Sequence, residues 1–402
     1  NWLGEYITVF FDRWEMIRTF FEKNKTEKFY SNYILFDHLN FLSKNHIDFG
    51  KNVQKEEWNH WVFFRILNYL NIPNLSLIEK KFTKKDFNNK HDLSGSINAI
   101  KIVDNLISKL AFKFNKVIFE SFYFPKKEYL KICLRCNLIP SRYSNFFNFN
   151  IKENTKSKNN IRHRLKDLLI KTNHQDKFIQ FLLMNIHKDM PQSYLENFKL
   201  IKRKVLPFAK RKKIIFSMHS IFVNDNFKIY IAETKKIGSK YIHAEHGGGL
   251  TFAANSHFDF FEKISDKIIR WDNTEQKKNI YFNLSPTLPT IVNSKNEKDK
   301  DQCSIIFVEP RKYLLKYHRG PGLDQSINYF NELTQFVNNL DIAIKSKIKF
   351  RTKGNYSYDS KKFFLEIFGK ESIEEVSDKN SYEKTMLNSR LIIVTYPETA
   401  FS

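Results

Sequence analysis

The stretch KIIFSMHSIFVNDNFKIYIAETKKIGSKYIH, residues 213–243, contains two short apolar runs on either side of a segment with helical spacing. The runs at 213–218 and 240–243 have the composition of buried strands. Between them, residues 225–237 carry apolar side chains three and four apart and stop before Gly238, a residue that commonly ends helices. Strand, helix and strand with short links predict a right-handed βαβ unit of a parallel sheet.

Further apolar runs and helical segments lie on both sides of this unit. Strand-like runs at 116–121 and 266–271 extend it, and a second series follows with strands at 304–308, 348–351 and 391–395 and helices at 325–344 and 382–387. Residues 1–115 are mostly helical in pattern, with aromatic stripes at 2–21 and 58–70 that indicate a packed core. The predicted fold class is therefore α/β, with two Rossmann-like domains and a helical N-terminal region.

The domain boundaries follow from a change in composition. Residues 286–302 are rich in Pro, Asn, Lys and Asp, which is typical of a linker. We assign an N-terminal domain to 1–290, helical over 1–115 and α/β over 116–290, a linker to 291–302 and a C-terminal domain to 303–402. Because the chain stops shortly after the strand at 391–395, we expect the C-terminal domain to be incomplete.

The charge of the chain is strongly positive. Its 402 residues include 67 Lys and Arg against 43 Asp and Glu, a formal net charge of +24. Such an excess attracts nucleic acid, anionic bilayers or phosphorylated substrates. The charge is spread along the sequence without a basic-aromatic module or zinc-finger spacing, so we expect solvated surface and no nucleic-acid partner.

The cysteines and the hydropathy pattern indicate a cytoplasmic protein. Three cysteines are too few for a disulfide framework, and Cys133 and Cys136 have the CxxC spacing of a metal or redox site but lack a second pair, which favours a structural role. No apolar run reaches about 18 residues, so no segment is expected to span a membrane.

The motif HAEHGGG, residues 243–249, uses three of the 11 glycines at the end of the strand 240–243. Ligands of open parallel sheets bind beyond the carboxyl ends of strands, and glycines there let a ligand approach the backbone. His246 could donate to a phosphate or move a proton. The alternative is a tight turn with a hydrogen-bonded structural histidine. The spacings GxGxxG and GxxxxGK[ST] are absent, so neither a dinucleotide fingerprint nor a P-loop is predicted.

Polar residues also follow three strands of the second series. They offer two guanidinium groups, an ammonium group, a carboxylate and hydroxyls at one edge of a sheet, which suits a phosphate that carries a nucleoside. The predicted donor-binding residues are Glu309, Arg311, Arg351, Lys353, Thr399 and Ser402.

The order of these motifs resembles a family of transferases of bacterial surface-carbohydrate biosynthesis. The matching residues are Asp225-x-Phe227, Gly238, Glu245-His-Gly-Gly and Ser265-Asp-Lys-Ile-Ile-x-Trp271, with Glu245 at a position where the family usually has Gln. Blocks at 119–140 and 390–399 are also similar, so the resemblance covers most of the chain.

The resemblance implies a fold of the GT-B glycosyltransferase type, akin to capsule and Kdo-type transferases. In such folds the acceptor binds the N-terminal half and the activated sugar the C-terminal half, with the chemistry in the cleft between them. The implied function is transfer of a sugar from a nucleotide donor, with CMP-linked nonulosonate or Kdo favoured, during O-antigen or capsule synthesis. The implied acceptor is lipid-linked or an oligosaccharide, and the positive charge predicts peripheral binding to the anionic cytoplasmic face of the inner membrane.

The leaving nucleotide is an anion, and GT-B enzymes commonly neutralise it with basic side chains and helix N-termini instead of a metal. No DxD pair lies between apolar strands, since Asp299-Lys-Asp301 falls in the linker, and we expect neither a metal nor an organic cofactor. An inverting reaction needs a general base, for which Glu245, His246 and Asp225 are the candidates, with Gly247 and Gly248 beside the reacting groups. The sequence does not choose among them, and a retaining enzyme needs no such base.

Two other functions are compatible with the sequence. One is transfer of a polyol phosphate from a donor such as CDP-glycerol, a reaction of teichoic-acid-type polymerases that share the GT-B architecture. The other is a non-catalytic protein of polysaccharide assembly that has kept the fold, because a fold alone does not specify a reaction.

Overall fold

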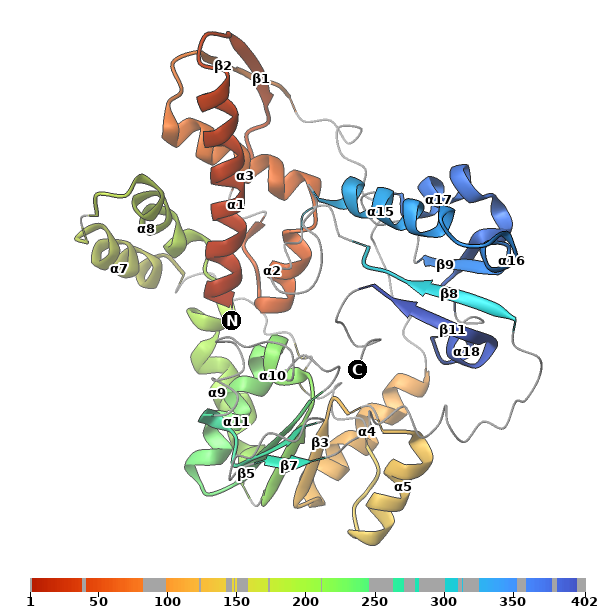
Figure 1. Ribbon diagram of the computed structural model, residues 1–402. Coiled ribbons are helices and arrows are strands. Elements are labelled where there is room, and N and C mark those ends of the chain that lie inside the picture. Colours follow the sequence, from red (N-terminus) through yellow and green to blue (C-terminus); the bar gives the residue numbers. More distant parts are fainter. Residues whose placement is uncertain are drawn as a thin grey trace. The chain divides into compact units, whose positions relative to one another are not determined.

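A computed structural model of the chain (Figure 1) describes residues 2–37, 41–81, 99–122, 124–141, 147, 149, 158–172, 174–210, 212–245, 263–270, 279–281, 301–309, 313, 325–352, 359–377 and 382–395. The chain divides into two compact units. Unit 1 comprises 1–120, 141–215 and 219–239, and unit 2 comprises 121–140, 216–218 and 240–402. The boundary expected at 290 and residues 291–300 of the expected linker lie outside the described residues, so the domain assignment stays a prediction.

The N-terminal part of unit 1 is held together by aromatic side chains. α1 (Trp2–Lys23), α2 (His46–Asn52), α3 (Glu56–Leu70) and α8 (Lys177–Asp189) share a core that includes Tyr6, Phe10, Trp58 and Phe181. The rings of Tyr6 and Phe10 lie 4.4 Å apart, and those of Phe10 and Trp58 lie 5.8 Å apart. The two predicted helices are confirmed, and their aromatic stripes form the core.

The same region contains two strands that the sequence did not predict. β1 (Phe29–Tyr33) and β2 (Leu75–Glu79) form a parallel pair, and α7 (Lys158–Ile170) is a further helix of this unit. Each strand has only five residues, and pairing with a segment 46 residues away creates it. Local helical periodicity carries no information about such a pairing.

A five-stranded sheet follows, with its strands in chain order. It consists of β3 (Val117–Glu120), β4 (Ile214–Ser217), β5 (Lys240–Ala244), β6 (Lys267–Arg270) and β7 (Asn279–Tyr281). β5 pairs in parallel with β6, and β6 with β7. The first four strands were predicted, and the three-residue β7 was not.

The helices that accompany this sheet follow local sequence signals. In unit 1 these are α4 (Ala99–Phe114), α9 (Phe198–Ala209), α10 (Ser220–Val223) and α11 (Asp225–Lys236), and in unit 2 it is α5 (Lys126–Arg135). The Asn224 side chain accepts from the Phe227 N–H at 3.1 Å and caps α11, while Gly238, with φ of +92°, follows its end. The helix predicted over 225–237 is therefore confirmed.

A four-stranded sheet in unit 2 has a different strand order. β8 (Gln302–Ile306), β9 (Ile348–Thr352), β10 (Ile373–Glu375) and β11 (Ser389–Val394) are all parallel and lie in the order β10-β9-β8-β11. α15 (Ser326–Asn338) and α17 (Ser360–Phe368) pack on one face of the sheet, and α18 (Tyr382–Asn388) lies on the other (Figure 1). β9 and β10 lie on one side of β8, and β11 lies on its other side. The strand order therefore reverses between β8 and β11.

Several details of this region differ from the prediction. The expected helix 325–344 is two helices, α15 and α16 (Ile342–Lys345), and β8 begins at Gln302, inside the expected linker. α17 and β10 were not predicted. The α/β class with parallel sheets is confirmed. Among the described helices, none has both the length and the apolar composition that crossing a bilayer requires.

Candidate functional site

The carboxyl end of β5 places Glu245 in a buried position. Its backbone N–H donates to the Ile269 carbonyl at 2.9 Å and so continues the β5–β6 ladder by one residue. Side chains alternate along a strand, so Tyr241, His243 and Glu245 lie on one face, and all three are buried. The predicted carboxylate thus ends a row of buried polar side chains at the edge of the sheet.

The register of β5 and β6 brings a basic residue to the same edge. Ala244 pairs with Ile269, so the next pair in the ladder is Glu245 and Arg270. Residues paired in a parallel sheet share a face, and Arg270 is buried as well, at 8% exposure. Side chains of opposite charge therefore occupy neighbouring strand ends. The sequence analysis did not select Arg270, although an arginine at the end of an apolar strand was a visible signal.

Tyr241 and His243 continue this row into the sheet. The Tyr241 hydroxyl lies 3.2 Å from His243 Nδ1. Burial raises the pKa of Tyr241 far above its ordinary value, and the nearby Ser217 hydroxyl of β4 only partly offsets this, so the phenol stays neutral. The Tyr241 backbone is fixed by its N–H, which donates to the Asp266 carboxylate at 2.8 Å. His243 is a functional candidate that the sequence analysis quoted but did not assign.

Asp225, the other predicted carboxylate, lies in unit 1 at the first turn of α11. Its side chain is almost completely buried. It accepts four hydrogen bonds from three elements, α2, the short helix η3 (Gln192–Tyr194) and α11 itself. The donors are the His46 N–H at 2.9 Å, the Ser193 hydroxyl at 2.7 Å, the Tyr194 hydroxyl at 2.7 Å and the Lys228 ammonium at 2.9 Å.

These donors determine the chemistry of Asp225. Burial alone would raise the pKa of its carboxyl group, but Lys228 and the hydrogen bonds from Tyr194, Ser193 and the His46 backbone outweigh it and hold the pKa below its ordinary value. A carboxylate with a lowered pKa whose oxygens are engaged by four donors is a weak proton acceptor. Asp225 and its four donors, called the Asp225 cluster from here on, link α2, η3 and α11. This arrangement fits a structural role better than that of a general base.

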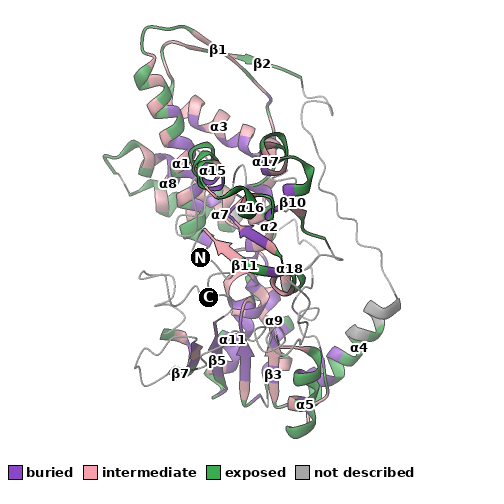
Figure 2. Cartoon of the chain, turned by 45° about the vertical axis from the view of Figure 1, so that its right-hand side comes forward, coloured by how far each residue is buried: buried purple, intermediate pink, exposed green. Residues whose placement is uncertain are grey.

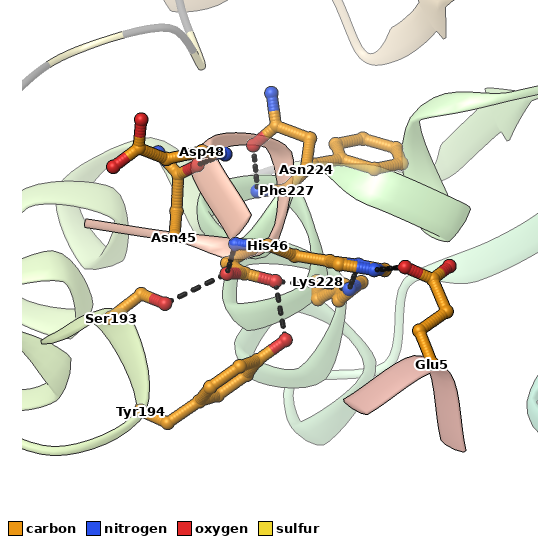
Figure 3. Close-up of polar contacts among 10 residues, drawn as sticks. Glu5, Asn45, His46, Asp48, Ser193, Tyr194, Asn224, Phe227 and Lys228 are labelled. Carbon is orange, nitrogen blue, oxygen red and sulfur yellow. Dashed lines mark hydrogen bonds and ion pairs between the residues drawn. The ribbon is translucent and has the colours of Figure 1, made fainter. Parts of the chain in front are cut away.

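The Asp225 cluster extends toward the surface through His46. Lys228 Nζ lies 3.4 Å from His46 Nδ1, and His46 Nε2 lies 2.8 Å from a carboxylate oxygen of Glu5 (Figure 3). His46 is buried, whereas the Glu5 side chain is 52% exposed. The first helix of the chain is thereby tied to the same cluster.

The carboxyl ends of β8 and β9 place two predicted donor residues on opposite faces of their sheet. Glu309, three residues beyond β8, accepts from the Ser360 hydroxyl of α17. Arg351, inside β9, donates to the Thr385 hydroxyl of α18 and pairs with Glu374 at 3.6 Å. Because α17 and α18 cover different faces, the structure does not bring these two side chains together.

Thr352 is a further candidate at this edge that the sequence analysis missed. Its hydroxyl is fully buried and has no hydrogen-bond partner among the described residues. Thr352 shares a strand face with Phe350, whose ring stacks on Phe364 of α17 at 4.0 Å. Thr352 is thus a polar group without an assigned role at the carboxyl end of β9, on the face of the sheet that α17 covers.

Comparison with known protein families matches the whole chain, residues 1–402, to the LIC12162 family transferase. The chain belongs to this family. It is therefore a transferase, and hence an enzyme. Neither a curated protein nor a solved structure matches it.

A transferase needs a group that activates the acceptor and groups that stabilise the leaving part of the donor. Among the described residues, the β5–β6 edge holds a buried carboxylate, Glu245, and the β8–β9 edge holds Glu309, Arg351 and Thr352. No cluster of three His, Cys, Asp or Glu side chains suited to a metal ion occurs in the described part of the chain. The remaining predicted residues, His246, Gly247, Gly248, Arg311, Lys353, Thr399 and Ser402, lie outside the described residues.

Proposed function

We propose that this transferase is a glycosyltransferase of cell-surface polysaccharide synthesis, of the O-antigen or capsule type, that uses a nucleotide-sugar donor. The observation that carries the proposal is the strand order β10-β9-β8-β11. It is the 3-2-1-4 order of a doubly wound nucleotide-binding sheet, in which ligands bind beyond the carboxyl ends of the strands where the order reverses. A second parallel sheet, β3 to β7, supports an architecture of two Rossmann-like halves, as in GT-B enzymes.

The donor nucleotide is assigned to the carboxyl edge of the four-stranded sheet. The strand order reverses between β8 and β11, where the Val308 N–H donates to the Tyr329 hydroxyl at 3.2 Å and this hydroxyl also bonds Thr395. Glu309 and Thr352 stand at the same edge. In this proposal Arg311, Lys353, Thr399 and Ser402, from the segments that follow these strands, complete the site and neutralise the phosphate.

The acceptor is assigned to the carboxyl edge of β5 and β6. An oxygen of the acceptor attacks the anomeric carbon, the new C–O bond forms while the bond to the phosphate oxygen breaks, and the electron pair leaves with the nucleotide. In an inverting reaction the acceptor proton moves to a base, for which Glu245 and His246 are the remaining candidates. Asp225 is left out of this role because its oxygens are already engaged by four donors.

The donor that we propose is a CMP-linked nonulosonate or Kdo. Such a donor carries one phosphate and one sugar carboxylate, and a guanidinium such as that of Arg311 pairs well with a carboxylate. No metal is required in this scheme, because basic side chains and helix N-termini carry the leaving-group charge. We therefore expect transfer to be unchanged by EDTA.

Calorimetric titration of the chain with CMP, CDP, UDP and GDP tests the proposal. We expect micromolar binding of CMP that is lost in Lys353→Ala. The matched control is Lys347→Ala, since Lys347 precedes β9 and Lys353 follows it. Arg351→Ala is a poor probe because it leaves the Glu374 carboxylate, whose side chain is only 9% exposed, without its ion pair.

Each other outcome contradicts a stated part of the proposal. Preference for UDP or GDP overturns the donor assignment. Turnover of CDP-glycerol, with no turnover of CMP-sugars, replaces glycosyl transfer by polyol-phosphate transfer. Absence of nucleotide binding would favour a different transferred group or an assembly role.

A further inference from the structure

The described buried side chains of α4 (Ala99–Phe114) lie on one side of this helix of unit 1. Ser108, Ala111 and Phe112 are buried, and the Phe112 ring contacts the rings of Phe147 and Tyr230 at 5.6 and 5.4 Å. Its C-terminal end is fixed by the Lys212 ammonium, which donates to the backbone carbonyls of Phe112 and, at 2.7 Å, Asn115. The last two turns of α4 are therefore held in place by the Phe112 ring, the small side chains of Ser108 and Ala111, and the Lys212 hydrogen bonds.

The opposite side of α4 is apolar and exposed. Five large apolar side chains are between 38% and 62% exposed, namely Val103, Leu106, Ile107, Leu110 and Phe114. Their spacing of three, four, seven and eleven residues places them on one face of the helix. In Figure 2 much of α4 carries the colour of exposed residues, in agreement with these values.

This distribution is the reverse of that of an ordinary surface helix. The described large aliphatic side chains of α4, from Val103 to Leu110, are exposed, while Ser108 and Ala111 contribute to the buried side. Single exposed apolar residues are normal, but a continuous stripe of five marks a surface that binds something apolar. The exposed apolar face of α4 therefore indicates a surface that binds a partner.

The charges next to the stripe indicate what that partner is. Lys109 and Lys113 are exposed and form a row, four residues apart, directly beside Leu106 and Leu110. Lysines at the border of an apolar helix face extend their ammonium groups to lipid phosphates while their stems lie on the apolar surface. A second copy of the chain is a poorer occupant, because two chains that each carry a net charge of +24 repel each other, whereas anionic lipid attracts them.

We propose that the exposed face of α4, defined as Val103, Leu106, Ile107, Leu110 and Phe114 with Lys109 and Lys113, docks the protein on the surface of an anionic phospholipid bilayer. The helix lies in the plane of the interface, with its apolar stripe among the upper acyl segments and its lysines at the headgroups. None of these residues belongs to the two sheet edges described above, and the proposal does not depend on which group the enzyme transfers.

Flotation with vesicles of phosphatidylcholine alone or with phosphatidylglycerol tests the proposal. The variant is Leu106→Glu/Leu110→Glu. The matched control is Leu168→Glu/Ile170→Glu in α7, because these two apolar residues are 67% and 52% exposed, against 56% and 53% for Leu106 and Leu110, and the change of charge is the same. We expect the wild type to bind the anionic vesicles, the α4 variant to bind at least about tenfold more weakly, and the control to stay within about threefold of the wild type. Lys109→Gln/Lys113→Gln should weaken binding to anionic vesicles by roughly fivefold for each lysine.

Three results would overturn the proposal. The first is absence of binding by the wild type, and the second is equal binding by the wild type and the α4 variant. The third is a melting temperature of the α4 variant well below that of the α7 control, because the stripe would then be covered by the chain itself. A concentration-dependent dimer in sedimentation, lost in the α4 variant and without vesicle binding, would assign the face to a second copy and also overturn the proposal.

Discussion

Asp225 in unit 1 and Glu245 in unit 2 are both buried acidic residues, and the sequence treats them as equal candidates for a general base. Their surroundings differ. Asp225 accepts from four donors supplied by α2, η3 and α11. Glu245 ends a row of polar side chains at a strand edge and has Arg270 as its neighbour in the register.

This comparison shows that burial alone does not identify a catalytic carboxylate. A carboxylate that links several elements contributes to stability, and its lowered pKa removes the proton affinity that a base needs. A carboxylate at the carboxyl end of a parallel strand lies where ligands bind in such sheets. Single substitutions at the two carboxylates should therefore affect different properties of the protein.

The largest expected effect on stability is that of Asp225→Ala. The substitution removes the acceptor of four hydrogen bonds and leaves the Lys228 ammonium, which is mostly buried, without its ion pair. We expect the free energy of unfolding to fall by about 4 kcal/mol, measured by chemical denaturation. Asp301→Ala is the control, since its ion pair with Lys347 is exposed and should contribute about 0.5 kcal/mol or less. A loss of unfolding free energy below about 1 kcal/mol for Asp225→Ala would show that the Asp225 cluster does not stabilise unit 1.

A smaller effect is expected from pH. The folded state lowers the pKa of Asp225, so the stabilisation is present above the pKa of the unfolded chain, about 4, and is lost as the pH falls through the folded value. The difference in melting temperature between wild type and Asp225→Asn should therefore be constant from pH 7 to 5 and shrink below about pH 4. A difference that grows on acidification would contradict the assignment.

The smallest effect concerns the other sheet edge. Thr352→Val keeps the shape of the side chain and removes a buried hydroxyl that has no partner among the described residues. We expect the ligand-free protein to become more stable by about 1 kcal/mol, because an unpaired buried hydroxyl is costly. If this hydroxyl contacts the donor, the same variant should bind nucleotide about tenfold more weakly. Destabilisation by the valine would show that the hydroxyl is paired in solution.

The sequence predicted the elements whose signals are local. Apolar runs such as 213–218 and 348–351 gave β4 and β9, and Gly238 marked the end of α11. The pair β1–β2 and the short β10 were missed because distant pairing, not local pattern, creates them.

The candidate site was predictable only to the same extent. The position of Glu245 after a strand was visible in the sequence. The neighbourhood of Arg270 depends on the register between two strands, and the role of Asp225 depends on contacts with residues 31 to 179 positions away. Both features depend on contacts between residues that are far apart in the chain, and local sequence patterns do not reveal such contacts.

The central claim is that the strand edge carries the chemistry and the Asp225 cluster carries stability. The most direct test compares Glu245→Gln with Asp225→Asn by the rate of nucleotide release from the donor that titration identifies, at a temperature where both variants are folded. We predict that Glu245→Gln loses about 10²- to 10³-fold in rate at a temperature where it is fully folded, while Asp225→Asn melts earlier than wild type but keeps its rate within about threefold. A fully active Glu245→Gln, or a folded Asp225→Asn with a rate reduced by about 10²-fold or more, would contradict the account.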